Sequence, residues 1–480
     1  MRKSLQASLN KLIYQRYLPR PTPINLFWPL ALLFLFITGC SLLQEPVGPV
    51  VPPPDPTVQS AQTLEELLAS SDEIIVDPNG GVSPAVEPEC ETLVNAVSQQ
   101  QLMVYVQTLE GFGTRNTFSD TQRDDFGIGA ARRWIFNEFE RVGAGRLQVE
   151  YQDYSFNFQG LNTTQRNVIA TLPGASEHPG VVVLIANYDS RAADWLDGSS
   201  RAPGADDNGS GVANMLEIAR LLSSRTWNQT IVFVASTAEE QGTYGSRHFV
   251  QDAVLDGMII DAAINNDMIG GRAGIPQSVR LFADGPDTSG NLQLARYIDY
   301  VGGLYLPTLP INTINALDRQ ERWGDQREFV NAGIPAVRLI ESEEDLDIQN
   351  STRDTWSLID YDYFANVVKL NLAVLCNMIG APPPPPTPII APMADPGSFL
   401  LSWIPSPEAA GYAVSFRPLG SGVYPPFRFI SANQTSNVVL SGFDPNTTYA
   451  ISIAAVGDNG RLGYFSPEFL TISEQTASYP

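Results

Sequence analysis

Acidic residues recur in this sequence at the ends of apolar runs that are typical of β-strands. One lies in the glycine-rich stretch APGADDNGSG, between a β-branched run and a helical pattern, and others follow the strand-like runs VVVLIAN, VFVAST and AAINN. The carboxyl ends of parallel strands meet at one edge of a sheet, so these acids are expected to converge. They are Asp189, Asp207, Glu239, Glu240 and Asp267.

Converging carboxylates need a compensating positive charge. Two like charges about 4 Å apart repel by roughly 4 kcal/mol at an effective dielectric constant of 20. A divalent metal ion would offset this repulsion, and nearby arginines or protonated acids are the alternative. The pattern therefore indicates a metal site, with a purely structural cluster as the competing interpretation.

These acids are spread over a region in which strand-like and helical patterns alternate. Helical spacing begins in TLVNAVSQQQLMVYVQTLEGF, and strand-like runs include LQVEYQDYSFNF, VVVLIANYD, QTIVFVAST and PAVRLIE. Such alternation predicts an α/β fold over residues 91–380: a mostly parallel mixed sheet with helices on both faces.

Four ordered blocks in this region carry a family resemblance: GADDNGSG, AEEQGTYGS, NNDMIG and GDQREFVNAGIPAV. They resemble the signature blocks of the co-catalytic zinc exopeptidases, the family of bacterial leucyl aminopeptidase, aminopeptidase Y and glutamate carboxypeptidase. The resemblance implies two zinc ions that share a bridging aspartate and a bridging water. By position, Asp207 would bridge the metals, Glu240 and Asp267 would each hold one, and Glu239 would be the general base.

The sequence departs from this family at the histidine ligands. Asn187 stands where the family has its first histidine, Gln326 where it has its last, and Asn350 where a further histidine lies near the substrate. By the same resemblance, Asp189 would orient the ligand at position 187, and Asp325 would stand beside Gln326. An amide oxygen is a harder and weaker donor than imidazole nitrogen, so manganese, magnesium or calcium could replace zinc.

Two functions follow from these residues. In the first, a divalent cation binds with Asn187 and Gln326 among its ligands, and Glu239 activates water for peptide hydrolysis of the aminopeptidase type. In the second, the chain is an inactive pseudopeptidase that serves as an extracellular binding module, with Arg322 or Arg327 balancing the charge. A third interpretation, a structural surface protein, leaves the four acidic blocks without an explanation.

The C-terminal part of the chain reads as a separate β module. Residues 381–387 form a proline-rich linker, after which short alternating strands replace the helical signal. Trp403, Tyr412 and the segment LSGFDPNTTY resemble a fibronectin type III domain over residues 388–476, an immunoglobulin-like sandwich. The resemblance implies a spacer or adhesion module with a possible cell-surface or matrix partner.

The N-terminus carries export signals. Residues 1–39 contain basic residues followed by the apolar run LFWPLALLFLFITG, and the end of this run resembles a bacterial lipobox at Cys40. This pattern predicts cleavage, lipid attachment to Cys40 and anchoring to the outer face of a bacterial membrane. Residues 40–90 are rich in proline and small residues, which predicts a disordered spacer.

The net charge, the cysteines and the histidines bear on partners, disulfide pairing and metal ligands. A formal net charge of −23 argues against nucleic-acid partners, which require basic clusters. Cys90 and Cys376 flank the folded body, but two cysteines alone do not establish a disulfide, and their pairing stays open. His178 and His248 fall on none of the ligand positions and are expected to be surface or packing residues.

Overall fold

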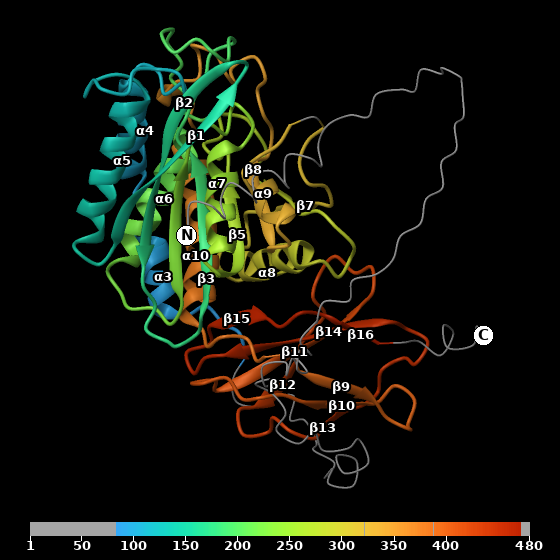
Figure 1. The fold of residues 1–480 in the computed structure, drawn as a ribbon. Helices are drawn as coiled ribbons and strands as arrows, with labels where there is room; N and C mark the ends of the chain where they lie inside the picture. Colours follow the sequence, from blue (N-terminus) through green and yellow to red (C-terminus); the bar gives the residue numbers. More distant parts are fainter. Residues whose placement is uncertain (1–82, 321, 387, 472–480) are drawn as a thin grey trace, which may run out of the picture. The chain divides into compact units, whose positions relative to one another are not determined.

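The body of the protein is built on a mixed sheet of eight described strands (Figure 1). A computed structural model describes residues 83–320, 322–386 and 388–471, which belong to one compact unit. The strand order is β1-β2-β4-β3-β5-β8-β6-β7. The bounds are β1 (Gln148–Phe158), β2 (Leu161–Leu172), β3 (Gly180–Asn187), β4 (Thr230–Ser236), β5 (Ile259–Asn266), β6 (Val279–Phe282), β7 (Ile311–Ile314) and β8 (Ala336–Glu341).

The parallel part of the sheet lies at its centre. β4, β3, β5 and β8 are consecutive neighbours and all pair in parallel, while β1, β2 and β6 add antiparallel pairs. This arrangement confirms the predicted mixed, mostly parallel sheet. β2 lies where no strand was predicted, because its first half, LNTTQR, is polar; it forms a hairpin with β1.

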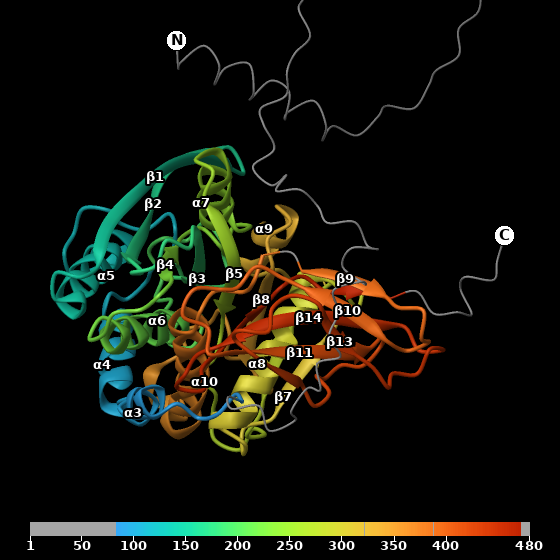
Figure 2. The ribbon, with the colours of Figure 1, turned by 90° about the horizontal axis from the view of Figure 1, so that it is seen from below.

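Helices cover both faces of the sheet, as predicted (Figure 2). Successive side chains of a strand point to opposite faces, so Val182 and Leu184 of β3 pack with α4, α5, α6 and α10, whereas Val183 and Ile185 pack with α7 and α9. The bounds are α3 (Pro88–Asn95), α4 (Gln99–Gly111), α5 (Gly127–Gly143), α6 (Gly209–Leu222), α7 (Tyr244–Leu255), α8 (Gly290–Tyr305), α9 (Gln326–Asn331) and α10 (Tyr361–Gly380), with a 3₁₀ turn at Trp356–Leu358.

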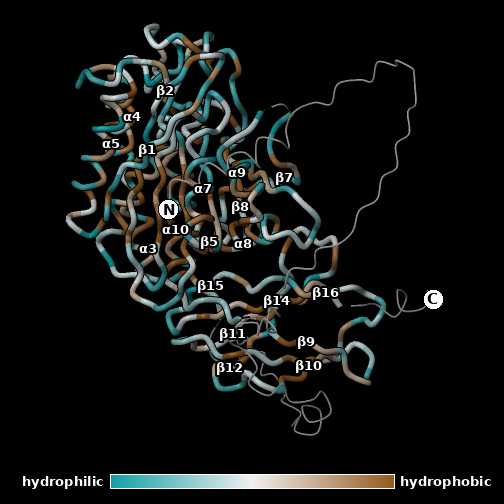
Figure 3. The backbone as a smooth tube through the Cα atoms, in the orientation of Figure 1, coloured by the Kyte–Doolittle hydropathy of each residue, from teal (hydrophilic) through white to brown (hydrophobic). Residues whose placement is uncertain are grey.

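Helix α10 is the most apolar helix of the described body (Figure 3). By length and composition it could cross a membrane, but most of its residues are buried inside the protein. It packs against α3, α4, α6 and α8. A helix that is hydrophobic nearly all round is typical of the centre of a large core, and α10 has that role here.

The described residues of the C-terminal module form two sheets, as expected for the predicted sandwich. One has the order β13-β10-β9, and the other β12-β11-β14-β15 with β16 paired to β14. Their bounds are β9 (Ile389–Pro392), β10 (Phe399–Ser402), β11 (Gly411–Pro418), β12 (Arg428–Ser431), β13 (Val438–Leu440), β14 (Tyr449–Val456), β15 (Leu462–Phe465) and β16 (Phe469–Leu470). Trp403 and Tyr412 lie in the core between the sheets.

The central strands of the module's larger sheet, β11 and β14, are buried on both faces. Every residue of β14 is buried, because alternate side chains enter the sandwich core and the core of the α/β body. Tyr297 of α8 donates a hydrogen bond to the carbonyl oxygen of Leu462 at 2.7 Å, and Arg296 pairs with Glu468 at 3.2 Å. The module is therefore packed onto the body.

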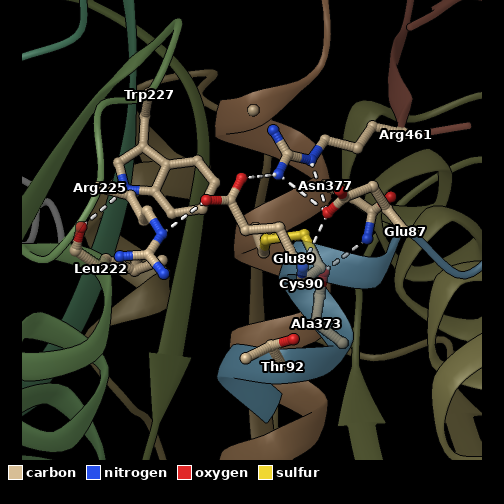
Figure 4. Close-up of a disulfide and its surroundings, with 12 residues drawn as sticks. Glu87, Glu89, Cys90, Thr92, Leu222, Arg225, Trp227, Ala373, Asn377 and Arg461 are labelled. Carbon is tan, nitrogen blue, oxygen red and sulfur yellow. Dashed lines mark hydrogen bonds and ion pairs between the residues drawn. A yellow bond between two sulfur atoms is a disulfide. The ribbon is translucent and has the colours of Figure 1, made fainter. Parts of the chain in front are cut away.

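A disulfide joins Cys90 to Cys376, which answers the question that the sequence left open (Figure 4). The bridge ties α3 to α10, with Cα atoms 5.9 Å apart. Beside it, Arg461 of the β module pairs with Glu87 at 2.9 Å and stacks on Trp227 at 5.3 Å. Because α3 already begins at Pro88, residues 88–90 belong to the folded body, and the predicted end of the spacer at residue 90 is too late.

Removing this disulfide should destabilise the protein strongly. The cysteines are 286 residues apart, so the bridge restricts a long loop of the unfolded chain, and a Cys90→Ala/Cys376→Ala variant should lose about 4 to 5 kcal/mol of unfolding free energy. Urea unfolding of the variant and the parent measures the difference. Reduced parent protein should match the variant; an unchanged midpoint in both would contradict the expectation.

Candidate active site

A pocket of about 340 Å³ opens at the carboxyl ends of the central parallel strands. Four of the acids expected to converge line it: Asp207, Glu239, Glu240 and Asp267. In the described part of the chain, the wall also carries arginines, tryptophans and amides, namely Arg191, Arg319, Arg322, Arg338, Trp195, Trp323, Gln349 and Asn350. Positive side chains therefore already stand among the carboxylates.

The loop between β3 and α6 holds Asp207 at this pocket. Gly204 has φ +53°, and a Cβ at this position would lie 2.5 Å from the carbonyl oxygen of Asp207, so the close approach requires glycine. The carboxylate of Asp354 accepts the backbone N–H groups of Asp206 and Asp207 at 2.8 and 2.9 Å. The peptide bond between Asp207 and Asn208, the cap of α6, is cis.

Arg115 fastens the same loop from inside the protein. Its side chain is fully buried and donates to the carbonyl oxygens of Tyr188, Pro203 and Gly204 at 2.8, 2.6 and 2.7 Å. No sequence motif marks Arg115, because it is a lone arginine in the loop after α4. Its guanidinium positions the loop that presents Asp207.

Asp189 holds the turn that carries the candidate base. Its carboxylate is fully buried and accepts the backbone N–H groups of Glu239 and Glu240 at 3.3 and 3.2 Å. The expected role was to orient the side chain of Asn187, which instead donates to the backbone oxygen of Asp189 at 3.3 Å. The Glu239 carboxylate makes no hydrogen bond or ion pair to a described residue, so it is open to the pocket.

Glu240 is paired with a guanidinium group. Its Oε2 atom lies 2.7 Å from Nε of Arg191, whose guanidinium stacks on Trp195 at 4.6 Å. With its amide oriented by these neighbours, Asn350 donates to Oε1 of Glu240 at 2.9 Å and accepts from Arg191 at 3.2 Å. Both carboxylate oxygens of this candidate metal ligand are therefore engaged.

Asp267 and Asp207 are also engaged. Arg338 pairs with Asp267 at 2.9 Å and with the buried Asp318 at 2.6 Å. Arg338 reaches both from β8, the strand next to β5. Gln349 donates to Oδ2 of Asp207 at 2.8 Å. One oxygen of Asp267, Oδ1, is buried without a hydrogen-bond partner among the described residues.

Asn187 and Gln326, the expected oxygen donors to a metal, use these oxygens elsewhere. The Asn187 oxygen accepts from Asn208 at 2.8 Å, and the Gln326 oxygen accepts from Asn265 at 2.9 Å. Neither residue is among the described residues that line the pocket. Asp325, beside Gln326, is buried and accepts from the hydroxyl group of Ser236. The two amides act as parts of a hydrogen-bonded scaffold in this arrangement.

The arginines that meet the candidate ligands differ from those expected. Arg322 lines the pocket but pairs with Glu344 at 3.0 Å, and Arg327 pairs with Glu328 at 2.8 Å. Arg191 and Arg338 take that place instead. A signal for Arg338 was present in the sequence, because a charged residue inside the buried strand pattern PAVRLIE requires a partner.

Both histidines lie outside the pocket, as expected. His178 pairs with Asp261 at 2.7 Å, and the ring of His248 stacks on that of Tyr154 with centroids 5.1 Å apart. Neither side chain is near a candidate metal ligand among the described pocket residues.

Burial shifts the pKa values of the carboxyl groups around the pocket. It raises the pKa of Glu239 well above its ordinary value, and neighbouring carboxylates add to the effect. It also raises the pKa of Asp189 to about 7 and that of Asp267 to about 6. Burial would raise the pKa of Asp318 too, but Arg338 and a second arginine hold it at about 2. One close guanidinium group does not reverse the effect of burial at Asp267 or Glu240, because the pKa values of both acids stay raised beside Arg338 and Arg191.

These contacts do not fit the pair of zinc ions that the resemblance implies. No imidazole reaches the pocket from a described residue, both amide oxygens are already hydrogen-bonded, and guanidinium groups contact Glu240 and Asp267. Within the described ranges, three acidic or sulfur ligand atoms come within 4.8 Å of one another only beside the disulfide. Two zinc ions on these acids would require Arg191 and Arg338 to move away.

The site lies in a region that matches a known family. The model of peptidase family M28 matches residues 167–375, and the fibronectin type III model matches residues 384–470. A "probable zinc metalloprotease" of Leptosphaeria maculans is 30% identical over 422 residues, which cover 80% of this chain and 97% of that protein. The chain belongs to peptidase family M28. A second M28-related protein, a "probable zinc metalloprotease" of Pyricularia oryzae, is 34% identical over 352 residues, or 64% of this chain and 70% of its own.

A solved structure has a similar fold. The LapA aminopeptidase of Legionella pneumophila has a TM-score of 0.50 and 19% identity over 64% of this chain and 77% of its own. The predicted exopeptidase-like body followed by a fibronectin type III domain is thus confirmed, and membership of M28 supports the expectation of a hydrolase. The two relatives named above are fungal, so they do not support the expectation of a bacterial source.

Replacing Arg115 should loosen the Asp207 loop. In an Arg115→Met variant the buried carbonyl oxygens of Tyr188 and Pro203 lose their donor, so the unfolding free energy should fall by on the order of 3 kcal/mol. Urea unfolding measures this loss. Arg201→Met, at a half-exposed arginine that pairs with Glu110, is the matched control and should change stability little. Equal effects of the two variants would show that Arg115 has no special role.

Proposed function

We propose that this chain is a peptide hydrolase of the aminopeptidase type that acts at the pocket around Glu239. The observation that carries the proposal is that the Glu239 carboxylate is unpaired among the described residues while its backbone is held in place. It lines the pocket and has no described hydrogen-bond partner, while its backbone is held by the buried Asp189. A general base must be held in place and yet remain free to meet water and substrate, and Glu239 meets both conditions.

The residues of the pocket suggest how such a reaction would run. Glu239 would accept a proton from a water molecule that attacks the peptide carbonyl carbon, and would return it to the departing amine. Arg319 and Arg322 bring N–H donors to the same pocket, which suits the negative charge that develops on the carbonyl oxygen. Trp195 and Trp323 are 42% and 46% exposed and offer apolar surface to substrate side chains.

The names of the relatives favour a divalent metal in this family, most simply zinc. The ligands found here do not fit a zinc pair, so the steps above are assigned to the side chains alone. Manganese, magnesium and calcium belong in the assay, because carboxylates and amides suit them.

A second function is favoured by a different observation. The pairing of Glu240 with Arg191 and of Asp267 with Arg338 would also suit a pseudopeptidase that binds peptides without cleaving them. In that case the pocket and the β module would together serve as an extracellular binding protein. Neither function involves nucleic acid, because the surface is strongly acidic.

We also propose that the protein is exported and anchored by lipid on Cys40 to the outer face of a membrane. Cys40, the predicted signal peptide and most of the predicted spacer lie outside the described residues. Support comes from the sequence pattern and from the disulfide, which is typical of proteins that fold in an oxidising compartment.

Replacing Glu239 by glutamine tests the hydrolase. The full chain and the Glu239→Gln variant are compared on peptides with free N-termini, with chelator and with zinc, manganese, magnesium or calcium. Loss of the base should lower kcat by about 100-fold or more. Glu150→Gln, a change at an exposed glutamate of β1, is the matched control and should leave kcat unchanged.

The outcome also separates the two functions. Peptide binding without product under every metal condition, with the same affinity in Glu239→Gln, would establish the binding protein in place of the hydrolase. A Glu239→Gln variant as active as the parent would remove Glu239 from the mechanism.

A further inference from the structure

We propose that Arg191 and Arg338 supply in this pocket the positive charge that metal ions supply in the zinc members of the fold, so that the pocket holds no resident metal. The inference rests on the proposed function only for the choice of pocket, and it does not require that the protein cleaves peptides. It departs from the metal-dependent chemistry that the names of the relatives suggest.

The two acids expected to hold one metal each are both paired with arginines. Glu240 lies 2.7 Å from Arg191, and Asp267 lies 2.9 Å from Arg338. Each pair is well shielded from solvent: the side chains of Arg191 and Glu240 are 18% and 8% exposed, and those of Arg338 and Asp267 are 1% and 6% exposed. A buried guanidinium beside a buried carboxylate is a stable arrangement only if the pair stays together, because separation leaves two unpaired charges.

The surroundings hold both arginines in place. Arg338 also donates to the backbone oxygen of Asp267 at 2.9 and 3.0 Å and pairs with Asp318 at 2.6 Å. Arg191 is fixed by Trp195 on one side and by Asn350 on the other. Moving either guanidinium group away from its acid would break several hydrogen bonds or ring contacts. A metal ion would therefore have to displace an arginine together with these contacts.

The replaced histidine positions point the same way. Asn187 and Gln326 are satisfied within an amide network that includes Asn208 and Asn265, and their oxygens are not directed to the pocket as free ligands. Asn350 uses its amide to join Glu240 to Arg191. Asn350 thus belongs to the Arg191 group, while Gln326 shares Asp318 with Arg338. In the metal centre implied by the resemblance, positions 187 and 326 would be imidazole ligands, and position 350 would be a histidine near the substrate.

The proposal is tested by removing each guanidinium and asking whether a cation can take its place. Thermal unfolding of the full chain is followed with chelator and with zinc or manganese, for the parent and for Arg338→Met and Arg191→Met. The parent should not respond to the cation. Each variant should melt at a lower temperature in chelator and regain at least about 3 °C when the cation is added.

Arg166→Met is the matched control, because Arg166 pairs with Asp153 at an exposed site. It should respond to the cation no more than the parent does. Arg191→Met is the second variant in case Arg338→Met does not fold, since Arg191 is closer to the surface. Variants that fold but gain nothing from either cation would overturn the assignment of charge replacement.

Elemental analysis of the parent after dialysis against zinc and manganese completes the test. Well below one ion per chain is expected. One or two ions per chain, lost in Asp207→Ala, would overturn the proposal and leave the proposed hydrolase standing. A parent chain without metal that also cleaves no peptide would remove the hydrolase and leave this proposal standing.

Discussion

Buried carboxylates must find a positive or hydrogen-bonding partner, and this requirement organises the carboxyl edge of the sheet. Parallel pairing of β4, β3, β5 and β8 brings the ends of several strands together, and acids that are far apart in the chain meet there. The partners are guanidinium groups for Glu240 and Asp267, an amide for Asp207 and backbone N–H groups for Asp189. Glu239 alone among these five acids lacks such a partner in the described structure, which sets it apart as the group able to act on a ligand.

The scaffold behind this edge is rigid for several independent reasons. Arg115 and Asp354 fix the Asp207 loop by its backbone, and Asp189 fixes the turn of Glu239 and Glu240. In addition, the Cys90–Cys376 disulfide joins α3, the first described helix, to α10. The β module adds to this core because β14, in its larger sheet, is buried on both faces. A pocket whose walls are held in this way can present a preformed arrangement to a ligand.

Membership of peptidase family M28 and the contents of the pocket give complementary information. The family supplies the fold and the position of the acids, and it supports a hydrolase. The side chains around those acids in this chain are amides at positions 187, 326 and 350, and arginines in contact with Glu240 and Asp267. A peptidase fold can keep its candidate general base, here Glu239, while the charged groups around that base differ. Fold similarity therefore does not by itself assign the chemistry.

The sequence by itself determined the α/β body, the fibronectin type III domain that follows it and the acids that follow the strand-like runs, because periodicity and ordered motifs are local properties. It did not determine β2, whose first half is polar, or the disulfide, because two cysteines allow both states. Tertiary structure alone decided which arginines meet the acids. Arg191 and Arg338 lie 49 and 71 residues from the acids they contact, and only the parallel packing of neighbouring strands brings such groups within 3 Å of one another.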